Sequence, residues 1–181
     1  MDTQTSGLAT TTKPADVARA FIEALAKRDV DAAMDYVDEQ CVDDFVAVGL
    51  FEGRLAIRRF FDEMIAAFPD FEIAADAIVA DRSKAVVQWH AAGTFTGGSF
   101  QGVEPTGRHV ELRGVDVMEI AKGHVHHNTI YYDGASFARQ IGLLPRAQST
   151  ADRTIMSTFN AVTRLRGAMR RSASPEREGQ H

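Results

Sequence analysis

The chain is 181 residues long and has a single cysteine, Cys41, so no disulfide can form within it. It also lacks a long apolar run, because stretches such as 45–51 are far shorter than the roughly 20 residues that cross a bilayer. Residues 1–16 show neither a basic start nor an apolar segment, which argues against a secretory signal. These absences predict a cytoplasmic protein without membrane insertion.

The chain has no excess of positive charge either, because its formal net charge is −5. Residues 146–181 hold seven Arg against three acidic residues, or +4, which leaves −9 for residues 1–145. An acidic body argues against nucleic acid as a partner, because contacts to phosphates need basic side chains. The basic end can be a solvated helix face or a surface that touches an anion.

Hydrophobic residues make up 45% of the chain, which is enough for the core of one globular domain. Residues 1–13 have little to bury and are predicted to be a disordered lead. The domain is expected over 14–145. An amphipathic helix is expected over 146–171, and a polar disordered tail over 172–181.

The order of periodicities predicts an α+β fold. Helical spacing of apolar residues begins at Pro14, after Asp31 and at about Arg54, and a β-branched strand at 41–49 precedes the third helix. Four extended segments follow, at 71–80, 84–97, 108–121 and 124–132, and are predicted to form a strand meander. Lys122–Gly123 is the predicted hairpin turn between the last two. A sheet that curls round helices on one face leaves a pocket at its wide end.

Two helical segments follow the strands, a short one and a long one. Residues 134–144 form the first, which Pro145 closes. The second can begin at Ser149 or Thr150, and its apolar stripe must cover its own sheet or that of a partner: Ile155, Phe159, Val162, Leu165 and Met169.

Asp116 is the one charge on the apolar face of strand 108–121. Burial there should raise its pKa, and a carboxylic acid kept neutral can donate a hydrogen bond to a developing oxyanion. We therefore interpret Asp116 as a catalytic residue, more a neutral donor than a base. The alternative is a buried structural carboxylate.

Asp43 and Asp44 are adjacent in strand 41–49 and must point to opposite faces. Asp44 is predicted to point inward, because it shares its parity with three valines, Val42, Val46 and Val48. Two inward carboxylates can take different pKa values, so Asp44 would be the base and Asp116 the acid. Alternatively, Asp44 lies at a solvated rim.

Seven more side chains are predicted to contact a ligand: Phe21, Trp89, Met118, His126, Asn128, Ile130 and Tyr132. Alternation places the last four on one face of strand 124–132. The His124–His126 pair has no third ligand at a recognisable spacing, so no metal is predicted. The glycines of 97–107 lack the context of a phosphate cradle, so no nucleotide cofactor is predicted either.

The chain resembles the SnoaL-like polyketide cyclase, or ester cyclase, group of the nuclear transport factor 2-like superfamily. The resemblance rests on GTFTGGSFQGVEPTGRHVELRGVDVMEIAKGHV and YYDGASFARQIGLLP. It implies a cone-shaped, mainly antiparallel sheet with a mixed edge round three N-terminal helices, no cofactor and a homodimer. It also implies ring closure of a polyketide by an aldol step that uses carboxylate acid/base chemistry. The sequence departs from the group where Ile130 replaces its catalytic Asp and Asn128 replaces a common His.

The segment CVDDFVAVGLFEGRLAIRRFF is similar to the part of ketosteroid isomerase that carries its general base. This resemblance implies that Asp44 takes the place of the base and Asp116 that of the oxyanion-hole Asp. The tyrosine donor of that enzyme falls on Phe21, which has no hydroxyl.

Three functional hypotheses follow. The first is cofactor-free cyclisation or isomerisation of a polyketide- or steroid-like carbonyl compound. The second is non-catalytic binding or carriage of an apolar small molecule. The third is an interaction module that uses the C-terminal helix.

Overall fold

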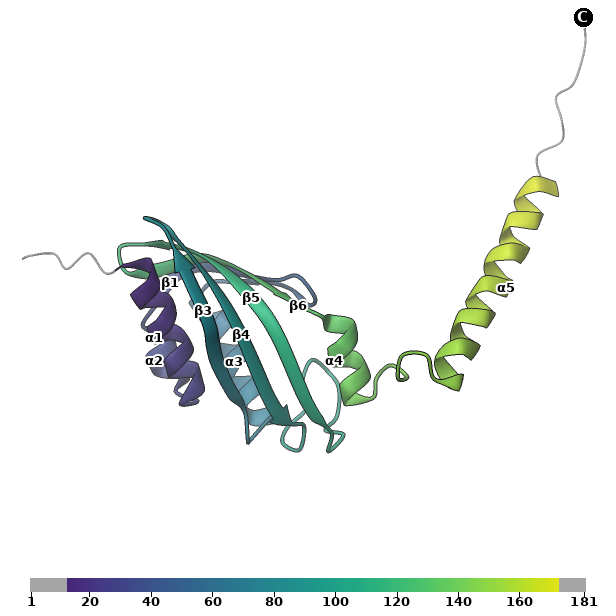
Figure 1. Ribbon diagram of the computed structural model, residues 1–181, viewed down its shortest axis with the longest axis horizontal. Helices are drawn as coiled ribbons and strands as arrows, with labels where there is room; N and C mark the ends of the chain where they lie inside the picture. Colours follow the sequence, from purple (N-terminus) through teal and green to yellow (C-terminus); the bar gives the residue numbers. More distant parts are fainter. Residues whose placement is uncertain (1–12, 173–181) are drawn as a thin grey trace, which may run out of the picture.

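The computed structural model describes residues 13–172 (Figure 1). The helices are α1 (Pro14–Ala26), α2 (Val30–Met34), α3 (Arg54–Ala67), α4 (Gly134–Ile141) and α5 (Thr150–Ser172). The strands are β1 (Val37–Phe45), β2 (Gly49–Glu52), β3 (Glu72–Ala80), β4 (Lys84–Thr94), β5 (His109–Ala121) and β6 (His124–Tyr132). The predicted disordered ends, apart from Lys13 and Ser172, lie outside the described residues.

All six strands belong to one sheet, in the order β2-β1-β6-β5-β4-β3. Strands β1 and β6 run parallel, whereas every other neighbouring pair is antiparallel. Helix α1 packs against β3, β4 and β5, and α3 packs against β1 and β2, so both cover the same face (Figure 1). The predicted α+β class with a mixed sheet round N-terminal helices is confirmed.

Short-range signals explain where several elements begin. Pro14 stands in the first turn of α1, where its missing N–H costs nothing. Asp29 accepts the backbone N–H of Ala32 at 3.0 Å and caps α2. Asp133 accepts the N–H of Ser136 at 2.8 Å and caps α4, so β6 ends and a helix begins at this residue.

The predicted hairpin at Lys122–Gly123 joins β5 to β6. Both residues have positive φ, +52° and +81°, as a tight turn with the twist of the flanking strands requires. Beyond the turn, Ile120 pairs with Val125 but Glu119 pairs with His127, which leaves one extra residue in β6. This bulge reverses the alternation at His126.

The bulge makes the predicted position of His126 wrong. Its side chain lies exposed, with Nδ1 3.6 Å from a carboxylate oxygen of Asp38, while Asn128, Ile130 and Tyr132 keep the inward direction. Strict alternation along β6 fails here because the extra residue of a bulge reverses the direction of the side chains between it and the start of the strand.

The inward direction predicted for Asp44 is also wrong. Strand β1 ends at Phe45, and its buried positions near the end are Cys41, Asp43 and Phe45, so Asp44 faces the opposite side. Phe45 decides the parity, because its ring packs 4.3 Å from that of Phe60 and buries far more area than a valine. Val46 and Val48 lie in the turn to the short strand β2, which was not predicted, so their parity is uninformative.

Candidate active site

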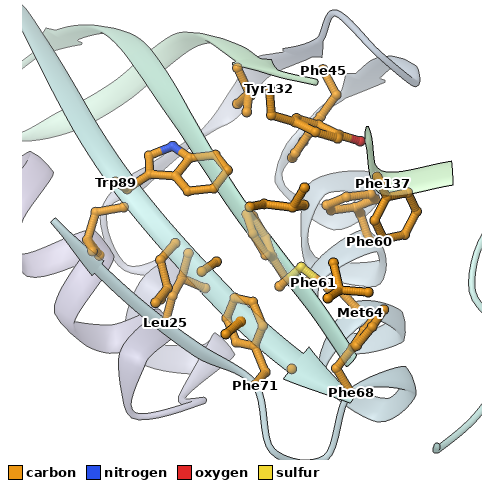
Figure 2. Close-up of a pocket in the computed structure, with 18 of the residues that line it drawn as sticks. Leu25, Phe45, Phe60, Phe61, Met64, Phe68, Phe71, Trp89, Tyr132 and Phe137 are labelled. Atoms are coloured by element: carbon orange, nitrogen blue, oxygen red, sulfur yellow. The ribbon is translucent and has the colours of Figure 1, made fainter. Parts of the chain in front are cut away.

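A cavity of about 110 Å³ lies between the sheet and helices α1, α3 and α4. Eight of the eleven phenylalanines line it: Phe21, Phe45, Phe60, Phe61, Phe68, Phe71, Phe100 and Phe137. Figure 2 shows labelled rings from α3, β4 and α4 turned toward one another round this space. Asp116 and Tyr132 are the two ionisable side chains in the wall, which is otherwise apolar.

Asp116 lies at the inner face of β5 and is 5% exposed. The indole N–H of Trp89 donates to its Oδ1 at 2.7 Å, and the amide Nδ2 of Asn128 donates to its Oδ2 at 3.3 Å. The three side chains come from three adjacent strands, because β5 pairs with β4 on one side and β6 on the other. Both carboxyl oxygens therefore accept hydrogen bonds from neutral donors.

Burial raises the pKa of Asp116 to about 6, while the hydrogen bonds from Trp89 and Asn128 act in the opposite direction. A donor aimed at each oxygen suits a carboxylate, which can only accept. At neutral pH the group is thus mainly ionised and has the pKa of an efficient general base. The arrangement favours a base over the neutral donor that we expected.

Gly114 makes room for the Trp89 side chain. A Cβ at this glycine would lie 2.2 Å from Cζ2 of the indole, far inside van der Waals contact. Gly114 and Trp89 are register partners on β5 and β4, so the indole lies across the neighbouring strand and reaches Asp116. A glycine is needed here for close approach, not for an unusual φ.

We predict that Gly114→Ala displaces the indole and destabilises the protein by about 1–3 kcal/mol, the usual cost of overpacking a core. Because Trp89 is the only tryptophan, urea unfolding followed by its fluorescence reports both the stability and the local displacement. Gly98→Ala is the control, since a Cβ there would meet no atom within 4 Å. Equal unfolding midpoints for the two variants would contradict this account.

A second buried carboxylate, Asp43, was missed as an inward residue. It is 2% exposed, and the thiol of Cys41 donates to its Oδ1 at 3.6 Å. Burial and the charge of Asp116 raise its pKa to about 7. The inward alternation of Cys41, Asp43 and Phe45 was the signal that could have found it.

Two buried acceptor atoms near this carboxylate have no hydrogen-bond partner among residues 13–172, namely Oδ2 of Asp43 and Oδ1 of Asn128. The two residues are register partners on β1 and β6. A proton on Asp43 would turn one of these acceptors into a donor and satisfy the other. The raised pKa and the unpaired atoms thus point to the same protonated form.

Of the predicted site residues, Phe21, Trp89, Ile130 and Tyr132 line the cavity with Asp116. Asn128 and Met118 are buried and paired in register, but neither lines the cavity. Asp44 and His126 lie elsewhere, as described above.

Neither a metal site nor a membrane-spanning helix is found among residues 13–172. Over residues 13–172, no three His, Cys, Asp or Glu side chains are grouped so that they could hold a metal ion. None of the helices in that range is long and apolar enough to span a membrane.

Several solved structures share this fold at low sequence identity. AclR of Streptomyces galilaeus, described provisionally as a hydroxylase, has a TM-score of 0.63 at 17% identity, over 88% of this chain and 96% of its own. A protein of Jannaschia sp. CCS1, described provisionally as a SnoaL-like polyketide cyclase, has a TM-score of 0.63 at 19% identity, over 74% and 97%. A nuclear transport factor 2-like protein of Burkholderia pseudomallei has a TM-score of 0.59 at 17% identity, over 70% and 95%.

These likenesses establish the nuclear transport factor 2-like fold. No curated protein matches the chain. The family described as SnoaL-like polyketide cyclase matches residues 15–141, which include every strand, helices α2 to α4, all of α1 except Pro14, and the whole cavity wall. The chain belongs to the SnoaL-like polyketide cyclase family.

Proposed function

We propose that the protein is a cofactor-free acid/base catalyst that cyclises or isomerises a small polyketide- or steroid-like carbonyl compound. The observation that carries this proposal is Asp116, the single carboxylate in the wall of an apolar cavity, with a pKa raised to about 6. A carboxylate with this pKa, screened from water, is suited to accept a proton from carbon near neutral pH.

The reaction begins when the Asp116 carboxylate takes a proton α to the substrate carbonyl. The electrons of the C–H bond form the C=C bond of an enolate, and negative charge develops on the carbonyl oxygen. The enolate carbon then attacks a second carbonyl of the same molecule, or Asp116 returns the proton to another carbon. The first outcome is aldol cyclisation and the second is isomerisation.

Tyr132 is placed to stabilise the enolate oxygen. It faces Gly114 on β5, two residues from Asp116, which puts the Cα atoms of Tyr132 and Asp116 about 7–8 Å apart. Its hydroxyl oxygen stands out in Figure 2 as a polar atom among carbon side chains, and burial raises the pKa of this hydroxyl. A carbonyl compound between the two residues could meet the base and the donor together.

We predict that Tyr132→Phe lowers turnover by about 10²–10³-fold, as expected for the loss of one oxyanion donor. The variant keeps the ring, so its unfolding midpoint should stay close to that of the wild type. The measurement is the rate of α-proton exchange described below. An unchanged rate would assign Tyr132 to packing alone.

The cavity volume limits the substrate. A volume of about 110 Å³ is below the roughly 150 Å³ of an engineered apolar cavity that holds benzene. The cavity as it stands is therefore smaller than one that holds a single ring. Even a one-ring compound such as cyclohexanone needs some of the phenylalanine rings of the wall to turn, and a larger polyketide or steroid needs a larger rearrangement.

The proposal is tested with cyclohexanone in D₂O, where NMR follows the replacement of its α-protons by deuterium. The wild-type protein is expected to accelerate the exchange over a buffer that contains the same concentration of free carboxylate. Asp44→Asn is the matched control and should keep the full rate, because Asp44 lies outside the cavity wall. A wild-type rate equal to that of the buffer would refute the role of base.

The second candidate function is binding of an apolar ligand without catalysis. Ile130, which stands directly opposite Asp116 in register and is 3% exposed, favours it, because an alkyl group here cannot transfer a proton. Cyclohexanone would then raise the melting temperature of the protein without exchanging its α-protons. A homodimer and a cytoplasmic location stay predictions in either case.

A further inference from the structure

Helix α5 carries an apolar face that no part of residues 13–172 covers. Its six large apolar side chains are 41–66% exposed: Ile155, Met156, Phe159, Val162, Leu165 and Met169. Figure 1 shows the helix standing apart from the sheet at the end of a linker. We propose that this face pairs with α5 of a second copy of the chain, in antiparallel orientation.

The exposed area agrees with a pairing surface. The six side chains expose on the order of 600 Å² of apolar area, which is the upper end of the largest patch on a typical monomer. Two copies together reach about 1,200 Å², the lower bound of specific protein interfaces. Helix α5 has 23 residues, and most of the stability of an amphipathic helix in a protein comes from packing of its apolar face.

The spacing of the face is that of a helix pair. Ile155, Val162 and Met169 recur every seven residues, and Leu165 occupies the intervening position that completes a coiled-coil seam. At about 100° per residue these four side chains span about 80° of the helix circumference, and Phe159 and Met156 widen the apolar face to about 180°. The heptad spacing of the four provides a seam for one facing helix.

The positive charge of α5 does not prevent the pairing. Arg153 and Arg164 are nine and two residues from Val162, which places both on the side of the helix opposite the seam. Each can remain in water when two helices pack through their apolar stripes.

Charge complementarity sets the orientation. Asp152 and Arg166 are two heptads apart, so they flank the same side of the seam at its two ends. In an antiparallel pair, Asp152 of each copy lies beside Arg166 of the other. In a parallel pair both would face the uncharged flank of Thr154 and Ala161. Asp152 accepts the N–H of Gln148 through Oδ2, so its Oδ1 is the oxygen that meets the arginine.

Sedimentation velocity of the full chain tests the pairing. Phe159→Glu combined with Val162→Glu places charge beside the seam and within it and is expected to halve the mass of the assembly. Asn160→Glu, on the opposite side of the helix, should leave the mass unchanged. A wild-type monomer, or a double variant with the wild-type mass and helical content, would overturn the proposal.

Cross-linking tests the orientation. In the antiparallel pair with Asp152 beside Arg166, the two Ala161 positions are about 6 Å apart along the helix axis, while the two Met169 positions are about 30 Å apart at 1.5 Å per residue. A short bismaleimide should therefore link Ala161→Cys into dimers and leave Met169→Cys unlinked. The natural Cys41 is fully buried and stays silent. Linking of Met169→Cys alone would show a parallel pair, and linking of neither would exclude the seam; both results overturn the proposal.

Discussion

Replacing Asp116 by Asn is expected to slow α-proton exchange in cyclohexanone by about 10²–10⁴-fold, the usual contribution of a positioned general base. The amide has nearly the shape of the carboxyl group and can still accept the Trp89 N–H, so the cavity should persist. It cannot take a proton from carbon, so the chemistry should stop. The measurement is the exchange rate by NMR, with the wild type and Asp44→Asn side by side.

The pH dependence of the exchange rate provides a second test of Asp116. If Asp116 is the base, the wild-type rate rises with pH through about 6 and then levels, because only the ionised form accepts a proton. Asp44→Asn should follow the wild-type curve. A wild-type rate that is flat across this range, or an Asp116→Asn variant with wild-type activity, would assign the exchange to another group.

Replacing Asp43 by Asn is expected to stabilise the protein at pH 8 by on the order of 4 kcal/mol, with little effect near pH 4. Burial and the charge of Asp116 raise the pKa of Asp43 from its usual 3.8 to about 7. The asparagine cannot ionise, so it avoids the cost of a buried charge. Its NH₂ can also donate to the unpaired Oδ1 of Asn128.

The sign of this effect follows from proton linkage. Between pH 4 and 7 the folded wild type holds a proton on Asp43 that the unfolded chain has already lost. The free energy of unfolding therefore falls as the pH rises through this window and levels above it. Asp116, with its pKa of about 6, adds a smaller loss in the same direction.

Urea unfolding from pH 4 to 8 measures the difference between the variant and the wild type. The Asp43→Asn curve should lose most of the decline toward pH 8 and keep the part due to Asp116. Asp44→Asn, one residue along the same strand on its other face, should parallel the wild type. A variant that is less stable than the wild type at pH 8 would show that Asp43 is ionised and paired in the folded protein.

The site differs from the one implied by the family resemblance in where its carboxylates lie. Ile130 replaces the expected acid and packs beside Asp116, and Asp44 lies outside the cavity. The polar groups that remain in the wall, Asp116 and Tyr132, lie on the neighbouring strands β5 and β6. The pocket is therefore retained, and under the proposed function its base lies on β5.

Local patterns in the sequence were enough for most elements. Pro14, the Lys122–Gly123 turn and Asp133 mark boundaries through their own backbone or side-chain chemistry, which needs no distant partner. The alternation of strand 109–121 likewise placed Asp116 on the buried face, because a regular strand transmits its parity along its whole length. The fold class and the central residue of the site follow from such short-range rules.

Side-chain direction near an irregularity needed the tertiary structure. The bulge at His126 and the end of β1 at Phe45 each reverse a parity that the sequence shows as continuous. The bulge depends on how β6 pairs with β5, and the direction of Phe45 depends on the area that its ring buries against α3. Both involve residues that are distant in the sequence. The ionisation of Asp116 was decided in the same way, since its two donors come from β4 and β6 and only the assembled sheet brings them to one carboxylate.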